Sequence, residues 1–156
     1  MNEWQHDRIG SAERGENPTV LMKLPSGYAV MGDTQFLPGY CVLLAAPSVM
    51  QLNDLPIAQR QRFLLDMSLL GEAIEHACHS NGLLRMNYEI LGNTDAYLHA
   101  HVFPRYTWEP IEHRLHPVWL YPHTMWTDKE HLYTQVHHPL KATIQQELRR
   151  LVQPSQ

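Results

Sequence analysis

The stretch YLHAHVFPR, residues 97–105, decides the interpretation of this sequence. Alternate side chains of a β-strand share a face, so we expect Tyr97, His99 and His101 to project from one face. Phe103 continues that row, and the apolar residues between face a core. Two strand rises of roughly 3.3 Å place the Cα atoms of the two histidines about 7 Å apart. At this spacing one imidazole can attack a phosphorus atom while the other holds its oxygens.

Four other segments have the composition of strands. The longest, YCVLLAA, is apolar without alternation, which is typical of a central strand buried on both faces. Turn residues such as Gly, Pro, Asn and Asp separate most of these segments in the chain. The five strands that we expect are 19–23, 28–31, 40–46, 84–91 and 99–106.

Two helices are expected. Between residues 56 and 80 the apolar side chains recur at helical spacing, Pro56 suits the first turn, and Asn81-Gly82 supplies the stop. A last helix begins at Pro139. Strands in hairpin-like order with one long helix favour an α+β fold with a mainly antiparallel sheet.

Within one compact domain we expect three parts. Residues 1–18 form a polar N-terminal arm that is loosely docked, and residues 19–106 form the core of the domain. Residues 107–156 form an irregular segment followed by the last helix. The irregular part is rich in Pro, Trp and His, and we expect its tryptophans to be packing or dimer residues.

Composition excludes several classes of protein. The chain has 156 residues, enough for one domain with its own core, and a formal net charge of −4 without a Lys/Arg cluster, which argues against binding long nucleic acid. Only two cysteines occur, Cys41 and Cys78, far apart and outside any C-x-x-C motif, so we expect no disulfide framework and no zinc ribbon. No signal peptide and no apolar run of about 18 residues is seen, so we expect a cytoplasmic protein without a membrane span.

These motifs resemble the histidine triad (HIT) family, whose signature alternates three histidines with apolar residues and often closes in Pro-Arg. His101 and the tail through Arg105 match the third histidine, and His99 falls on the middle histidine, the family's nucleophile. The segment FLPGYCVLL, residues 36–44, resembles the apolar-Pro-Gly-His-apolar segment that precedes the family's helix. The resemblance covers residues 19–106 and implies the HIT-like version of the fold, a mainly antiparallel five-stranded sheet with one long helix packed on it. The C-terminal helix expected from Pro139 onward lies outside the resemblance.

Three positions depart from the family pattern. Tyr97 stands in place of the first histidine, Tyr40 in place of the histidine after Pro-Gly, and Asn93 in place of the usual glutamine. A phenol has a pKa near 10, so Tyr97 can donate a hydrogen bond but cannot cycle a proton as readily as imidazole. These changes affect the expected rate and leaving group more than the fold.

The resemblance also implies roles for the site residues. His99 would attack the α-phosphorus of a nucleoside phosphate derivative, and His101 would hydrogen-bond a non-bridging oxygen. Asp33 would accept from the ribose hydroxyls. The remaining substrate-binding positions are polar residues near the histidines, namely Asn87, Asn93, Thr94 and Tyr97.

Three functions stay open at this point. The first is a nucleotide hydrolase or transferase that acts on dinucleoside polyphosphates or phosphoramidates through a nucleotidyl-histidine. The second is a nucleotide-binding protein with little or no turnover, and the third is a metal-dependent enzyme that uses the His99–His101 pair. The resemblance implies a homodimer with no required cofactor and no metal site, and it allows a divalent cation bound with the substrate phosphates.

Overall fold

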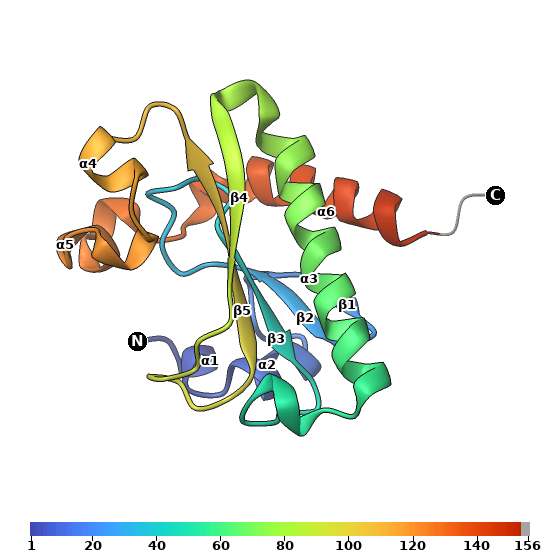
Figure 1. Ribbon diagram of the computed structural model, residues 1–156. Helices are drawn as coiled ribbons and strands as arrows, with labels where there is room; N and C mark the ends of the chain where they lie inside the picture. The colour runs from blue at the N-terminus through green and yellow to red at the C-terminus, as the bar shows by residue number, and fades with distance from the viewer. Residues whose placement is uncertain (154–156) are drawn as a thin grey trace.

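One antiparallel sheet organises the computed structural model, which describes residues 1–153. Its strands run in the order β1-β2-β3-β5-β4, and each neighbouring pair is antiparallel (Figure 1). The α+β fold predicted from the sequence is therefore confirmed. The strands are β1 (Val20–Leu24), β2 (Gly27–Met31), β3 (Cys41–Ala45), β4 (Leu83–Glu89) and β5 (His99–Tyr106).

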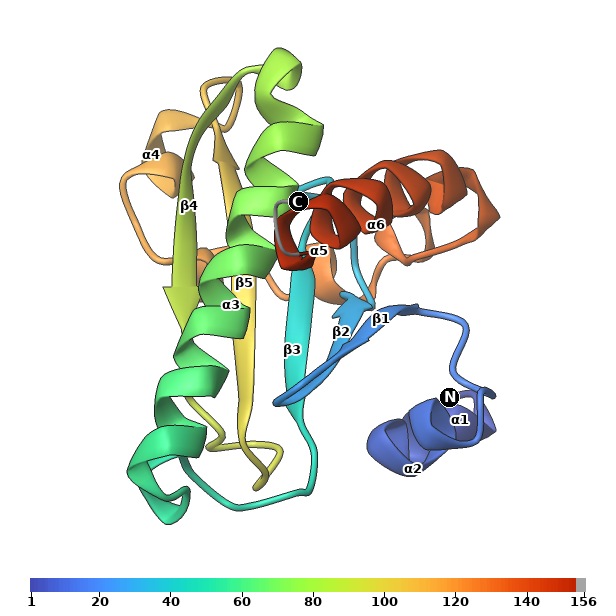
Figure 2. The same ribbon diagram turned by 90° about the vertical axis from the view of Figure 1, so that its right-hand side faces the viewer.

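Helix α3 (Ile57–Cys78) packs along one face of the sheet, and α6 (His138–Val152) lies across α3 and β1 (Figures 1 and 2). Both are the helices expected from the sequence. Ala100 and Val102 of β5 face α3 and are fully buried. The opposite face of β5, which carries the histidines, is therefore left for other parts of the chain to cover.

The segment between β5 and α6 covers part of that second face. The sequence showed no periodicity here, because each element is a single short turn of helix. On the side of the sheet away from α3 (Figure 1), the segment folds into α4 (Ile111–Arg114), η3 (Val118–Leu120), α5 (Thr124–Thr127), η4 (Lys129–His131) and η5 (Gln135–His137).

A buried ion pair anchors this segment to the sheet. Arg105 of β5 pairs with Glu109 at 3.0 Å, and both side chains are buried. The guanidinium also donates to the backbone oxygens of His113 and His116, each at 2.9 Å. Arg105 therefore binds the chain's own C-terminal segment.

The N-terminal arm is docked more firmly than expected. It forms α1 (Glu3–His6) and α2 (Arg8–Glu13), and Ser11 is fully buried. The Ser11 hydroxyl donates to the backbone oxygens of Trp4 and Arg8, each at 3.1 Å. The two helices have four and six residues, which is too short to show a periodic pattern in the sequence. No helix within residues 1–153 is both long and apolar enough to span a membrane.

Candidate functional site

A cavity lies on the face of the sheet opposite α3, where β2, β3 and β5 supply its floor. His99 and His101 line it, as the sequence predicted for a shared face. The N-terminal arm, the loop after β2 and the C-terminal segment supply the walls, through Arg8, Asp33 and the pair Trp119 and Trp126. Parts of the chain that are far apart in sequence therefore meet at the two histidines.

The orientation of His99 fixes which of its nitrogens carries the proton. Its Nδ1 lies 2.7 Å from the backbone oxygen of Tyr97. A carbonyl oxygen can only accept, so Nδ1 donates, and in the neutral imidazole Nε2 keeps its lone pair. His99 is only 6% exposed, which restricts the ring to this position. The geometry gives His99 the nitrogen that a nucleophile needs.

His101 is held by the hydroxyl of Tyr40, with 2.7 Å between Tyr40 Oη and His101 Nδ1. Burial, and next the neighbouring His99, lower the pKa of His101 to about 4. Burial raises the pKa of Tyr40 well above its usual value. Both groups are therefore neutral at pH 7. A phenol can donate or accept, and where the Tyr40 hydroxyl donates to Nδ1 the His101 proton lies on Nε2. This is the arrangement of a hydrogen-bond donor to an oxygen in the cavity.

Packing holds Tyr40 in this position. Its ring stacks on Phe103 with 3.9 Å between the centroids and 9° between the planes. Gly32 makes room for the ring, because a Cβ at that position would lie 2.1 Å from Tyr40 Cδ1. Phe103 and Gly32 thus hold the Tyr40 ring in the position where its hydroxyl contacts His101.

Two tryptophans complete the wall beside His101. The centroid of the Trp119 ring lies 4.8 Å from that of His101, and Trp119 stacks on Trp126 at 5.0 Å. The indole nitrogen of Trp119 donates to Glu89 at the end of β4. Sequence reasoning assigned these tryptophans to packing or a dimer and missed their place in the cavity, since no local pattern links them to β5.

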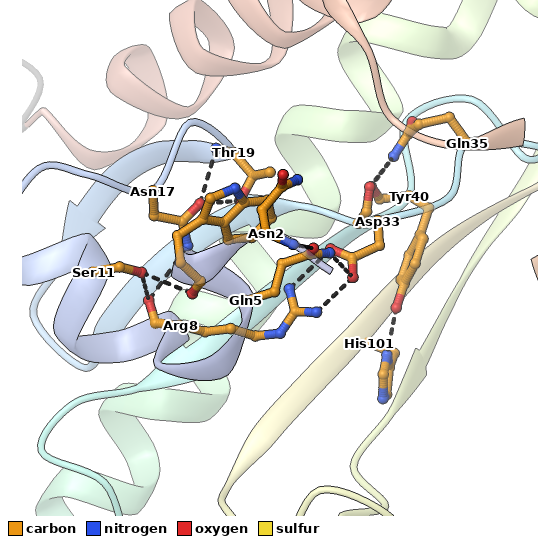
Figure 3. A network of polar contacts seen from close by, with 12 residues as sticks. Asn2, Gln5, Arg8, Ser11, Asn17, Thr19, Asp33, Gln35, Tyr40 and His101 are labelled. Atoms are coloured by element: carbon orange, nitrogen blue, oxygen red, sulfur yellow. Dashed lines mark hydrogen bonds and ion pairs between the residues drawn. The ribbon is translucent and has the colours of Figure 1, made fainter. Parts of the chain in front are cut away.

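Asp33 lies at the cavity, but residues of the arm already bind it (Figure 3). Arg8 Nη1 donates to Oδ1 at 2.9 Å and Nη2 donates to Oδ2 at 2.5 Å. Gln5 adds a hydrogen bond of 3.1 Å to Oδ2. No sequence pattern pointed to Arg8 as a site residue. It lies in the N-terminal arm, which was expected to be loosely docked.

The other predicted substrate-binding residues fall in different places. Tyr97 lines the cavity, with its ring centroid 4.9 Å from that of His99. Asn93 and Thr94 are exposed in the loop between β4 and β5 and do not line it. Asn87 is not brought to the histidines, because its amide oxygen accepts from Arg105 at 3.0 Å, at the anchor of the C-terminal segment.

The described residues contain no group of three or more His, Cys, Asp or Glu side chains placed to hold a metal ion.

Comparison with solved structures identifies the fold. A histidine triad protein from Marinobacter aquaeolei VT8 is 25% identical over 85% of this chain and 90% of its own, with a TM-score of 0.65. A hypothetical histidine triad nucleotide-binding protein from Sulfolobus tokodaii strain 7 is 15% identical over 92% and 91%, with a TM-score of 0.64. The diadenosine triphosphate hydrolase of Plasmodium falciparum is 13% identical over 85% and 76%, with a TM-score of 0.55.

No protein-family model matches the sequence, and no curated protein matches it. The structural neighbours are nevertheless histidine triad proteins that align over most of the chain. The chain therefore has the histidine triad fold, and the resemblance drawn from its sequence motifs is confirmed at that level. His99 and His101 lie side by side in its cavity, with 4.7 Å between ring centroids.

Proposed function

We propose that this protein is a nucleotide hydrolase or transferase that acts at the α-phosphate of a nucleoside phosphate derivative and forms a nucleotidyl intermediate on His99. The observation that carries the proposal is the hydrogen bond from His99 Nδ1 to the backbone oxygen of Tyr97, which leaves Nε2 unprotonated. The histidine triad fold supports it, since solved neighbours include a nucleotide-binding protein and a diadenosine triphosphate hydrolase.

The reaction has two steps. In the first, the lone pair of His99 Nε2 forms a bond to the α-phosphorus, and the bond from phosphorus to the leaving group breaks with its electron pair on the leaving group. In the second, the oxygen of water forms a bond to the phosphorus, and the bond from phosphorus to His99 Nε2 breaks with its electron pair on the nitrogen. The water gives up one proton to solvent, so the products are the nucleoside monophosphate and neutral His99. An acceptor hydroxyl in place of water would make the reaction a transfer. His101 Nε2–H stabilises the charge on a non-bridging oxygen in both steps.

The neutral groups around His99 favour one class of leaving group. Tyr97 stays protonated because burial raises its pKa, and His101 is neutral at pH 7. Neither readily supplies the proton that an amine needs in order to leave. A phosphate chain leaves as a stable anion, so we place dinucleoside polyphosphates ahead of phosphoramidates as substrates. No cofactor is required, and a divalent cation can accompany the phosphates.

A second candidate is a nucleotide-binding protein with little turnover. The observation in its favour is that phenols occupy positions 40 and 97, where the resembled family carries imidazoles. Turnover measurements on wild type and His99→Asn with a panel of nucleoside phosphates separate the candidates. The exposed His79, at the end of α3 on the other side of the sheet, provides the matched control His79→Asn.

We expect wild type and His79→Asn to hydrolyse dinucleoside polyphosphates and His99→Asn to lose at least about a thousandfold in rate, as for other catalytic nucleophiles. Equal turnover by wild type and His99→Asn would contradict the proposed nucleophile. Tight binding of nucleotides without turnover by wild type would favour the second candidate.

A homodimer belongs to the same proposal. β4 is an edge strand of the sheet, and Leu84 and Tyr88 on it are 44% and 42% exposed. Pairing of two such edges would continue the sheet and cover these side chains. Sedimentation velocity should give twice the monomer mass for wild type and the monomer mass for Leu84→Arg.

The free, buried thiols of Cys41 and Cys78 suit the reducing cytoplasm, where we place the protein.

A further inference from the structure

Arg8 is the single cation among the described residues that line the histidine cavity. The other charged side chains there are Asp33 and Asp95, and His101 is neutral at pH 7. A ligand with several phosphate charges therefore finds one fixed positive group in the cavity. That group comes from the N-terminal arm, outside the part of the chain that resembles the family.

The pairing of Arg8 with Asp33 occupies the acceptor oxygens on this side of the cavity and leaves hydrogen-bond donors for a ligand. Both oxygens of Asp33 accept from Arg8, in the bidentate geometry that makes arginine–carboxylate pairs strong. A ribose diol would have to compete with this pair for the same oxygens. A guanidinium has five N–H donors, and Asp33 takes two of them. The other three bind nothing within residues 1–153, so the subsite offers donors to a ligand.

The arm holds Arg8 in place from behind. Its backbone oxygen accepts from Ser11 at 3.1 Å and from Asn17 at 3.3 Å, and its guanidinium lies 5.4 Å from the centroid of the Trp4 ring (Figure 3 shows these hydrogen bonds). Its side chain is 24% exposed, which leaves it open to the cavity. A positioned but accessible guanidinium suits an anion.

We propose that Arg8, oriented by Asp33, binds a second phosphate group of the ligand and makes the protein selective for nucleotides that carry one. This takes the place of the role expected for Asp33 as an acceptor for ribose hydroxyls. This proposal depends on one part of the proposed function, namely that the ligand is a nucleotide. The second phosphate can stand on the ribose or in the 5′-phosphate chain, and the shared chemistry is a phosphate dianion on a guanidinium.

The test compares the affinities of adenosine 5′-monophosphate, adenosine 5′-diphosphate and adenosine 3′,5′-bisphosphate by calorimetry, with inorganic pyrophosphate as a fourth probe. Chromatography checks that each probe is recovered intact. For wild type we expect at least one of the two doubly phosphorylated nucleotides to bind about tenfold more tightly than the monophosphate, as for a charge-assisted hydrogen bond. Which of the two is preferred shows where the second phosphate stands.

Three substitutions locate the effect. Arg8→Gln should abolish the preference while the affinity for the monophosphate changes less than about twofold, and Arg8→Lys should keep part of it because the charge remains. The matched control is Arg14→Gln, at the end of the same helix, where the side chain is 53% exposed and pairs with Asp7. It should leave all four affinities unchanged.

Asp33→Asn separates a binding role of Arg8 from a purely structural one. It removes the competing negative charge and frees the guanidinium, so the doubly phosphorylated probes should bind as tightly as before or more tightly. A pair that only fixes the arm would make Asp33→Asn and Arg8→Gln lose the same affinity, and that result would overturn the proposal.

The proposal is also overturned if wild type binds all three nucleotides equally, or if Arg8→Gln weakens all of them equally. If no nucleotide binds but pyrophosphate binds in an Arg8-dependent way, the anion subsite stands and the proposed nucleotide function fails. If no probe depends on Arg8, the subsite fails, and turnover through His99 remains to be judged by its own test.

Discussion

At the residue scale, the two histidines differ in the group that hydrogen-bonds to their Nδ1 atoms. His99 donates its Nδ1 proton to a backbone oxygen, whereas His101 Nδ1 faces the hydroxyl of Tyr40. The backbone carbonyl can only accept, so His99 Nδ1 donates, whereas donation from the Tyr40 phenol to His101 Nδ1 leaves the His101 proton on Nε2. One ring then offers a lone pair and the other a proton, which divides the roles of attack and phosphate binding between them.

The first prediction concerns the protonation of His101. Burial disfavours the imidazolium, so its pKa is lowered to about 4, and the ring should stay neutral at every pH above about 5. An NMR titration of the imidazole nitrogens should show no transition of His101 between pH 5 and 9. A His101 midpoint near 6.5 would contradict the account.

The same shift has a consequence for stability. The unfolded chain binds a proton at His101 near pH 6.5 and the folded chain only near pH 4, so the folded state loses stability as pH falls through this window. The slope from this one group is at most about 1.4 kcal/mol per pH unit.

The second prediction concerns Gly32. An alanine Cβ would lie 2.1 Å from Tyr40 Cδ1, and the Tyr40 ring is stacked on Phe103. Gly32→Ala should therefore cost about 1–3 kcal/mol in the free energy of unfolding by urea, as for overpacked cores. It should also lower turnover at least as much as Tyr40→Phe, which removes only the hydrogen bond to His101. Wild-type stability together with wild-type turnover would show that Tyr40 does not hold His101.

At the element scale, the C-terminal segment depends on one buried ion pair rather than on regular structure. Glu109 accepts from Arg105, from the Tyr121 hydroxyl at 2.7 Å and from the Tyr106 backbone nitrogen at 2.6 Å. The segment carries Trp119 and Trp126 to the cavity. Disruption of the Arg105–Glu109 pair should therefore lower the stability of the fold and disturb the cavity wall.

The third prediction tests this anchor. Glu109→Gln leaves the Arg105 charge buried without its partner, which should cost about 3–5 kcal/mol in the free energy of unfolding. Glu112→Gln, an exposed position on α4, is the matched control and should change stability by less than about 0.5 kcal/mol. Urea denaturation measures both. Equal stability of the two variants would mean that the pair does not anchor the segment.

At the scale of the whole molecule, what could be predicted follows from how local each signal is. The five strands and the two long helices were predicted because each carries a local signal, a strand-like composition between turn residues or apolar side chains at helical spacing. His99 and His101 were predicted together because strand alternation places them on one face. Arg8, Trp119 and Trp126 could not be predicted, since their place at the cavity depends on how short, non-periodic segments dock against the sheet. Asn87 accepts a hydrogen bond from Arg105, and no sequence spacing indicates this partner.

Mapping the covalent intermediate shows whether His99 is the nucleophile. Wild type would be mixed with diadenosine triphosphate, quenched within the first turnover and digested for peptide mass spectrometry, with His99→Asn treated in parallel. We expect an adenylyl group on the peptide with residues 97–105, assigned to His99 by fragmentation and absent from the variant. Turnover of the substrate with the adenylyl group on His101, or on no residue, would contradict this role of His99.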